Sequence, residues 1–518
     1  MIDLPETSLH VAYVDEPELE FGHGQRLDNP KDGLFLYGPE GKSSQREVRI
    51  GVIGTDRGIK EFRLWLSRLQ AGIAVPKPGE REKAFRPHLS DFPGLKEAYG
   101  IDVNDDAIVS YALSLSDIEH RTSIANHHEA VSLTADLYID TVAQHLRDEE
   151  ASIDVWIMVV PEIIHDRCRP LASGRRSLDL SPGEFSKRQK KREDLPLFDS
   201  FIDNKAEDIF DDVPDFHRQI KAKLLTFGQT CQVVRETTLA PEKFLNRVGK
   251  PIRGTQDVAT VAWNLATAIY YKSQSTPPWK TAQMREGVCY IGLVFKLIPN
   301  HKDNHACCAA QMFLSEGDGV VFRGANGPWY TENKEFHLSK DAAKNLINRV
   351  LDTYKGKFGA YPRELFIHGK TKFSQDEWDA FSEAAPTETN IVGVRIKPTM
   401  GDVKLFRDGD YPCIRGTALI LGDQDAFLWT SGYIPRIDTY MGPETPNPIS
   451  VTILRATGDM PSIEIVLSDI MKLTKINYNS CNFNDGLPVT VRFAKMVGDV
   501  LTMGSAKGEE KQPFKFYV

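Results

Sequence analysis

The sequence predicts an α/β protein in which a Rossmann-like domain is followed by an RNase H-like domain. Two short apolar runs, VRIGVIGT at 48–55 and VWIMVV at 155–160, are typical of buried strands, and segments with helical spacing follow them. Strands that alternate with helices indicate a parallel sheet covered on both faces. From Gly287 onward several strands come in succession before strands and helices alternate, as in an RNase H-like mixed sheet.

The remaining elements follow from the same periodicities. In the first domain we expect one more strand, at 231–235, and helices at 59–69, 130–146, 216–227 and 258–272. In the second we expect strands at 288–298, 306–314, 319–324, 364–368, 391–397, 416–422, 425–430 and 449–455, and helices at 339–354, 374–383, 464–473 and 487–502. Residues 1–44 are rich in Pro, Gly and acids, which predicts an extended arm packed on the rest.

The composition limits both the location and the kind of partner. The 518 residues are 41% hydrophobic and 26% charged, as in ordinary globular proteins, and the net charge is −9. A nucleic-acid site would therefore have to be a local cationic channel. We see no signal peptide and no apolar run of about 20 residues. Seven cysteines without a CxxC pair favour a reducing compartment, so we expect a cytoplasmic protein.

Four polar side chains point to a site for a terminal phosphate. His217 and Lys221 are four residues apart and share one face of the predicted helix. Gln232 opens the next strand, and Lys272 closes a later helix. Cationic and amide donors that converge from element ends suit a terminal phosphate, which offers several acceptor oxygens. A solvated polar face is the simpler interpretation of the His–Lys pair taken alone.

The strand that opens the second domain lacks an expected acid. The stretch GVCYIGLVFK at 287–296 is typical of the first strand of an RNase H-like sheet. In active members of that fold, this strand carries a metal-binding aspartate, and here the place falls on Val294. A branched apolar side chain cannot hold a divalent cation, which needs oxygen ligands.

Together these residues resemble the short prokaryotic Argonautes, which consist of a MID and a PIWI domain. The arm EPELEFGHG…DNPKDGLFLYGP (16–39), the four polar residues and the YIGL segment (290–293) are similar to that family. The most specific match is the pair LTKINYNS (473–480) and LPVTVRFAK (487–495), which resembles the C-terminal PIWI signature. The resemblance covers nearly the whole chain, and it divides the chain into an arm (1–44), a MID domain (45–285) and a PIWI domain (286–518).

The resemblance also implies roles for the polar residues. His217, Lys221, Gln232 and Lys272 would bind the 5′-phosphate of a guide strand. In Argonautes the C-terminal carboxylate lies near this phosphate and can help to hold a divalent cation. Val518 would then contribute a ligand to Mg²⁺. A docked apolar C-terminus without a metal is the alternative.

Active PIWI domains use an Asp-Glu-Asp-x tetrad, in which x is Asp or His, and two divalent ions. Besides Val294, the third position most closely matches Lys370 in the segment LFIHGKTK (365–372), and the fourth matches Lys495. The glutamate would fall in the region of Glu332 and Glu335. Lysines repel Mg²⁺, so we expect a protein that does not cleave nucleic acid.

The function implied is guide-directed recognition within a prokaryotic defence system. The chain would bind a 5′-phosphorylated RNA guide and a complementary, single-stranded DNA target, with base pairing reading the sequence. Its partner would be an APAZ-domain effector with a TIR or sirtuin-like NADase, or a nuclease. Two alternatives remain open. One is a guided endonuclease whose metal site is rebuilt from Asp402, Asp408, Asp410 or Asp485. The other is an RNA-binding protein without a partner.

Overall fold

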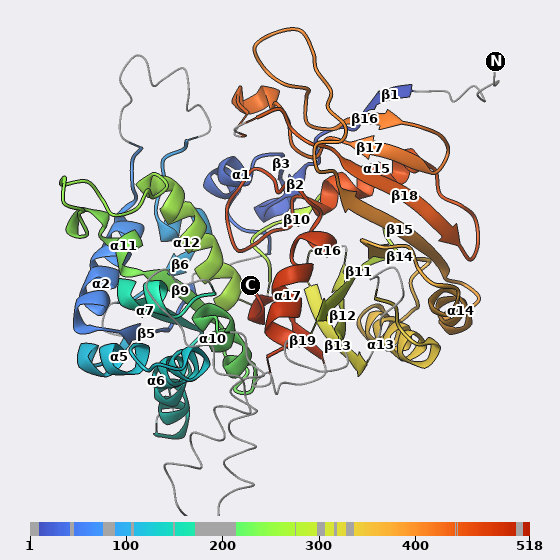
Figure 1. Cartoon of the computed structure of the whole chain (residues 1–518). Coiled ribbons are helices and arrows are strands. Elements are labelled where there is room, and N and C mark those ends of the chain that lie inside the picture. The colour runs from blue at the N-terminus through green and yellow to red at the C-terminus, as the bar shows by residue number, and fades with distance from the viewer. Residues whose placement is uncertain are drawn as a thin grey trace, which may run out of the picture.

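The chain folds around two large β-sheets that lie side by side, as the computed structural model in Figure 1 shows. The described residues, to which all statements below refer, are 10–41, 46–75, 89–104, 108–148, 151–170, 214–274, 276–297, 306–314, 317, 319–327, 336–440, 442, 444–503 and 511–518.

The first sheet has four parallel strands in the order β7-β5-β8-β9. Its strands are β5 (Ile50–Gly54), β7 (Val109–Ala112), β8 (Val155–Val160) and β9 (Cys231–Arg235). All six residues of β8 are buried, which requires helices on both faces. The helices of this part are α2 (Asp56–Ala71), α4 (Leu95–Tyr99), α5 (Leu115–Thr122), α6 (His127–Asp148), α7 (Glu162–Arg167), α10 (Phe216–Leu225), α11 (Glu236–Leu239) and α12 (Val258–Ser273).

The second sheet has ten strands in the order β1-β16-β17-β18-β15-β14-β11-β12-β13-β19. Its central strands β11, β14 and β15 are parallel, and the strands outside them run antiparallel to their neighbours. The strands of this part are β11 (Val288–Leu297), β12 (Ala306–Phe313), β13 (Gly319–Gly327), β14 (Glu364–Gly369), β15 (Asn390–Pro398), β16 (Thr417–Ile420), β17 (Asp425–Leu428), β18 (Ile449–Ala456) and β19 (Lys511–Pro513). The helices are α13 (Lys340–Phe358), α14 (Gln375–Ala384), α15 (Ile463–Leu473), α16 (Val489–Arg492) and α17 (Ala494–Leu501).

The N-terminal segment joins both parts of the molecule. Strand β1 (His10–Tyr13) pairs antiparallel with β16 and forms one edge of the ten-stranded sheet. Strands β2 (Leu19–Glu20) and β3 (Arg26–Leu27) form a small sheet with β10 (Lys280–Thr281), and α1 (Pro30–Tyr37) follows. A short pair of strands, β4 (Arg46–Glu47) and β6 (Ile101–Asp102), lies beyond α1.

A buried ion cluster fixes this segment to the second sheet. The Glu16 carboxylate binds Arg415 Nε at 2.8 Å and Lys475 Nζ at 2.7 Å, and both cations are almost fully buried. Lys475 Nζ also donates to the backbone oxygens of Asp28 (2.8 Å) and Phe483 (2.9 Å). The arm is therefore held by two buried cations that share one largely buried carboxylate.

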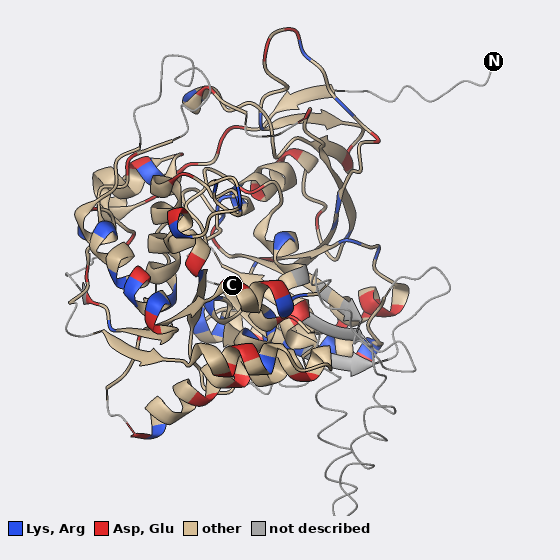
Figure 2. Cartoon of the chain, turned by 60° about the vertical axis from the view of Figure 1, so that its left-hand side comes forward, with Lys and Arg blue, Asp and Glu red and all other residues tan. Residues whose placement is uncertain are grey.

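The predicted α/β fold class is confirmed, and most expected elements are present within a few residues of their predicted bounds. The helix expected at 487–502 instead begins after Pro488 and is divided at Phe493 into α16 and α17. Among the described helices, none is long and apolar enough to cross a membrane. Lys and Arg are interspersed with Asp and Glu over the described ribbon (Figure 2), in line with a site that is local.

Candidate functional site

The four predicted phosphate-binding residues come together between the first sheet and the C-terminal segment. Helix α10 begins at its N-cap Asp215, whose side chain accepts from the backbone N–H of Arg218 at 3.3 Å. The helix then presents His217 and Lys221 on one face. Gln232 is the second residue of β9, and Lys272 lies in the last turn of α12.

Lys272 is the centre of the polar contacts. Its ammonium donates to Gln232 Oε1 at 2.5 Å and to Asn479 Oδ1 at 3.2 Å, and the side chain is only 2% exposed. Asn479 belongs to the loop after α15, so the second part of the molecule supplies one wall of the site. The site is thus completed by contacts between parts that are far apart in sequence.

Lys221 faces the C-terminal segment. Its ammonium donates to the backbone oxygen of Tyr517 at 3.3 Å, and Tyr517 and Val518 are both buried. Lys515 Nζ donates to the Gln274 backbone oxygen at 3.0 Å, directly after α12. Val518, the predicted metal ligand, therefore belongs to a segment that contacts the site.

The electrostatics favour an anion. Burial, followed by the charge of Lys221, lowers the pKa of Lys272 to about 7. Burial also lowers the pKa of Lys221 to about 8. His217 has one side open to solvent, but the protein around it, and then Lys221 and Lys272, hold its pKa well below the usual range. Lys221 therefore acts on both His217 and Lys272, which indicates that the three side chains lie within electrostatic reach of one another.

Among the described residues, neither of the two lysines has a carboxylate partner. Cys231 and then Asp215 raise the pKa of Lys221, and Cys231 raises that of Lys272, but burial outweighs these effects. Within the described residues neither ammonium forms an ion pair, whereas Lys223, on the same helix as Lys221, binds Asp136 at 2.5 Å. Buried charges are normally paired, so an uncompensated pair of ammonium groups predicts a bound anion.

Three residues that contribute to the site were not predicted from the sequence. Asn479 and the Tyr517 carbonyl contact Lys272 and Lys221 directly, and Cys231 lies beside both lysines. Nothing local in the sequence marks them, because their partners are far away along the chain. The segment LTKINYNS, which was recognised for its resemblance, does contain Asn479.

The three residues predicted to replace tetrad carboxylates lie on neighbouring elements of the second part. Val294 is in β11, Lys370 directly follows the adjacent parallel strand β14, and Lys495 is in α17, which packs against β11. Lys370 is exposed. The side chains of Val294 and Lys495, and all of Glu332 and Glu335, lie outside the described part of the structure.

A neutral histidine is buried beside these positions. His368, at the end of β14, is 1% exposed, and its Nδ1 lies 2.9 Å from Thr490 Oγ1 of α16. Burial lowers its pKa to about 3, so it carries no charge at neutral pH. A Cβ on Gly292 would lie 2.0 Å from the Thr490 backbone oxygen, so α16 sits directly on β11 here.

The acids that could rebuild a metal site do not form a cluster. Asp402, Asp408 and Asp410 are exposed in the loop between β15 and β16, and Asp485 binds Arg492 at 3.1 Å. Among the described residues, the one group able to surround a metal ion is Glu162, His165 and Asp166 on α7, in the other part of the molecule. There Glu162 is already paired with Arg235.

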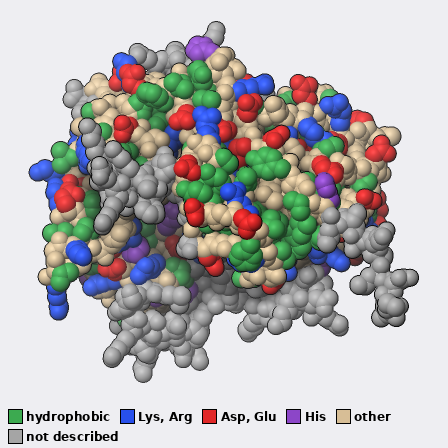
Figure 3. Space-filling model, turned by 90° about the horizontal axis from the view of Figure 1, so that it is seen from above, with side chains coloured by type: hydrophobic (Ala, Val, Ile, Leu, Met, Phe, Trp, Pro, Cys, Tyr) green, Lys and Arg blue, Asp and Glu red, His purple; other side chains and the backbone are tan. Residues whose placement is uncertain are grey.

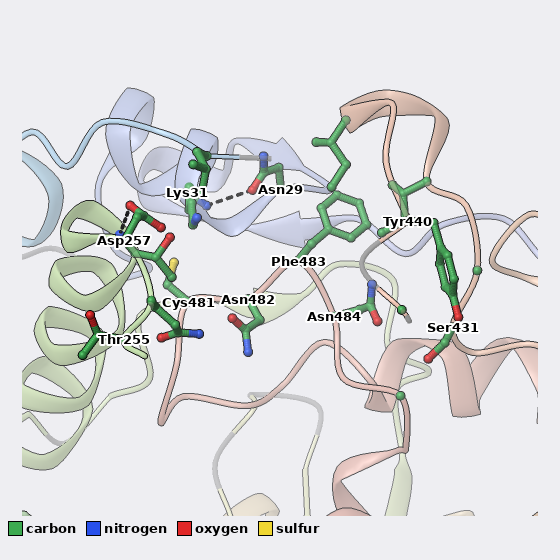
Figure 4. A pocket seen from close by; sticks show the side chains of 18 residues that line it. Asn29, Lys31, Thr255, Asp257, Ser431, Tyr440, Cys481, Asn482, Phe483 and Asn484 are labelled. Carbon is green, nitrogen blue, oxygen red and sulfur yellow. Dashed lines mark hydrogen bonds between the residues drawn. The ribbon is translucent and has the colours of Figure 1, made fainter. Parts of the chain in front are cut away.

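A second feature is an open cavity of about 750 Å³ at the amino-terminal end of α12. Figure 4 shows side chains from the arm, from the start of α12 and from two loops of the second part turned toward it. Amides and aromatic rings line it, including Asn29, Asn482, Phe483 and Tyr440. Phe483 is fixed by Lys475, whose ammonium lies 3.7 Å from the ring centroid.

Several solved structures that are similar to this chain are Argonautes. The Clostridium butyricum Argonaute bound to a guide DNA and a 19-mer target DNA is similar over 98% of this chain and 55% of its own, with a TM-score of 0.62 and 15% identity. The A. aeolicus Argonaute is similar over 97% and 54%, with a TM-score of 0.52 and 14% identity. Aa-Ago with externally bound siRNA is similar over 98% and 56%, with a TM-score of 0.54 and 14% identity.

These similarities establish the fold. The chain spans about half the length of the Argonautes that it matches. No protein-family model matches the sequence, and no curated protein matches it either.

Proposed function

We propose that this chain is a guide-directed nucleic-acid recognition subunit that binds the 5′-phosphate of a short RNA guide. The observation that carries the proposal is the pair of buried, uncompensated ammonium groups of Lys221 and Lys272. Gln232 and His217 lie beside them and provide further polar contacts. The Argonaute fold and the guide and target in one solved neighbour support the same proposal.

In this proposal each residue has a defined part. The two ammonium groups bind phosphate oxygens with charge-assisted hydrogen bonds. Gln232 and Asn479 orient Lys272, and the open His217 contacts the first nucleotide at the mouth of the site. The Val518 carboxylate would share Mg²⁺ with the phosphate, and this ion would add positive charge to that of the lysines. We expect Mg²⁺ to change the affinity for the guide less than the 5′-phosphate does.

The target would be single-stranded DNA, and the chain would not cut it. Three of the four tetrad positions would be Val294, Lys370 and Lys495, which offer no carboxylate, and the glutamate would fall in the region of Glu332 and Glu335. Output would come from an APAZ-domain effector with a TIR or sirtuin-like NADase, or a nuclease, as part of a cytoplasmic defence system. A guided endonuclease using Asp402, Asp408, Asp410 or Asp485 is the second candidate, and metal-dependent cleavage of a target would favour it.

The decisive measurement is the affinity for one RNA guide that carries either a 5′-phosphate or a 5′-hydroxyl, with and without Mg²⁺. We expect the phosphate to bind at least tenfold more tightly. His217→Ala combined with Lys221→Ala should remove this preference for every guide sequence. The matched control is Lys223→Ala, because Lys223 is on the same helix but binds Asp136. Equal affinity for both guide ends would contradict the proposal.

A further inference from the structure

A small ordered loop projects from the first part of the molecule just before α12. It runs from Phe244 to Ile252, and the Ile252 N–H donates to the Phe244 backbone oxygen at 2.9 Å. At its turn, the Asn246 side chain accepts from the backbone N–H groups of Val248 (3.0 Å) and Lys250 (3.1 Å). The loop therefore has a defined conformation although residues 245–252 are exposed.

The base of the loop is anchored to α2 and to the segment after β9. The Arg57 guanidinium lies 4.0 Å from the centroid of the Phe244 ring. Lys243 binds Glu61 at 2.5 Å, and Arg253 donates to Thr238 Oγ1. Because both ends of the loop are fixed, little conformational entropy would be lost when its tip binds a ligand.

The tip combines apolar and basic side chains. Leu245, Val248 and Ile252 are 50%, 77% and 44% exposed. Residues 243–253 contain four cations and no carboxylate, in a chain whose net charge is −9. Among the described residues Arg247 and Lys250 form no ion pair, unlike Lys243 at the base. On the upper face of the molecule, side chains of both charges surround apolar patches (Figure 3). The charged side chains of this loop are all positive.

The loop lies next to the amino-terminal end of α12 (Figure 1), the end at which the cavity is found. Thr255, Gln256 and Asp257 follow the loop directly and line that cavity. The 16-residue helix α12 is about 24 Å long at 1.5 Å for each residue, and Lys272 is the last residue but one at its other end. The loop is thus on the same part of the molecule as the proposed phosphate site, but at the far end of the helix that carries Lys272.

We propose that loop 244–252 binds the phosphate backbone of the target strand where it continues past the 5′ end of the guide. This inference rests on the proposed function. In the proposed function the guide–target duplex would run from the phosphate site across the second part, where the predicted tetrad positions lie. The strand that extends over the first part would then be the 3′ flank of the antiparallel target. Arg247 and Lys250 contact its phosphates, and the aliphatic tip packs on sugar or base faces.

A phosphate backbone fits this surface better than a protein does. The cations are unpaired and of one sign, which matches a uniformly charged polymer, and the neighbouring cavity has amides and aromatic rings suited to nucleotides. A partner protein remains a distinct outcome of the test. It would leave every affinity for nucleic acid unchanged.

The test compares Arg247→Ala/Lys250→Ala with the wild type and with Lys340→Ala/Lys344→Ala, an equal charge change on α13. Guide-loaded protein is titrated with a complementary single-stranded DNA, with and without ten thymidines added at its 3′ end, at several salt concentrations. We expect the loop variant to lose about five- to tenfold affinity for the flanked target only. The salt slope should fall by about 1.4, since each single-strand contact contributes about 0.7.

Equal loss on both targets, or no loss on either, would overturn the inference. Binding of a 20-nucleotide oligothymidine without any guide separates this result from failure of the proposed function. If guided binding is absent but the loop variant still lowers the salt slope for oligothymidine, the loop binds single strands and the guide proposal is wrong. If the guide binds through its phosphate and the loop variant has no effect, only the loop inference is wrong.

Discussion

The molecule buries two pairs of cations, and they differ in one respect. At the junction of the arm and the second sheet, Arg415 and Lys475 share the Glu16 carboxylate. Between α10 and α12, Lys221 and Lys272 have no carboxylate among the described residues, and their remaining contacts are neutral oxygens. Both pairs are almost completely removed from water.

The difference separates a structural ion cluster from a candidate ligand site. A buried cation with its own carboxylate stabilises one arrangement of the chain, and removing the carboxylate leaves an uncompensated charge. Buried cations without such a partner keep the full desolvation cost of their charge, and they gain most when an anion binds. The two centres should therefore respond oppositely to substitution.

The largest effect on stability should come from Glu16→Gln, which leaves Arg415 and Lys475 without their carboxylate at the junction. We expect the free energy of unfolding to fall by about 3–5 kcal/mol, because the loss of one partner exposes the full desolvation cost of the others. Urea unfolding measures this change. Glu18→Gln is the control, since the Glu18 side chain is exposed and only its backbone oxygen is used. A loss equal to that of the control would contradict the structural role of Glu16.

Lys272→Met should separate the two centres most clearly. We expect it to leave the guide-free protein as stable as the wild type or more so, because a strained buried charge is removed. It should lower the affinity for a 5′-phosphorylated guide by about 10- to 100-fold, the value of about 1.5–3 kcal/mol for a charged hydrogen bond. Lys475→Met, the matching change at the junction, should destabilise the protein instead. Equal changes of the unfolding temperature in Lys272→Met and Lys475→Met would contradict the difference between the two centres.

Guide affinity should depend on pH in a direction set by the lysines. In the empty site Lys272 has a pKa of about 7 and Lys221 of about 8, so both are protonated below pH 7 and lose their protons as pH rises through 7 to 9. A phosphate needs the charged forms, so its affinity should fall up to about tenfold per pH unit over that range. Binding measured at pH 6.5, 7.5 and 8.5 tests this. A 5′-hydroxyl guide should show no such trend, and a flat profile for the phosphorylated guide would exclude proton uptake.

The smallest effect should come from Asn479→Ala, which removes one acceptor of the Lys272 ammonium. We expect a loss of about fivefold in affinity for the phosphorylated guide, since a net hydrogen bond contributes about 1 kcal/mol. The control is Asn482→Ala, an exposed amide in the same loop. Fluorescence anisotropy with a labelled guide resolves this change. Identical losses in both variants would mean that the loop, and not Asn479, matters.

Local features of the sequence were sufficient for much of the fold. The run VWIMVV predicted β8 because six consecutive buried positions need six apolar residues. The spacing of His217 and Lys221 predicted that they share a helix face, and α10 has both residues. Lys272 was placed at a helix end by periodicity, and α12 ends one residue later.

Contacts across long separations could not be predicted. The pairing of Lys221 with the Tyr517 backbone, and of Lys272 with Asn479, depends on how the two sheets pack. The arm was expected to lie against the body, but nothing in HVAY specifies that it extends a sheet beside β16. Edge pairing of this kind depends on main-chain hydrogen bonds, which leave little trace in side-chain pattern.

Because β1 pairs with β16, it cannot form its final contacts until late in the synthesis of the chain. His10 aligns with Ile420, so the ribosome must add on the order of 400 residues before the first strand can find its place. At about 5–20 residues per second this takes roughly 20–80 seconds. During that time the nascent arm, with Val11 and Tyr13 uncovered, is open to pairing with other chains, and the newly made protein would benefit from a chaperone that binds extended apolar segments.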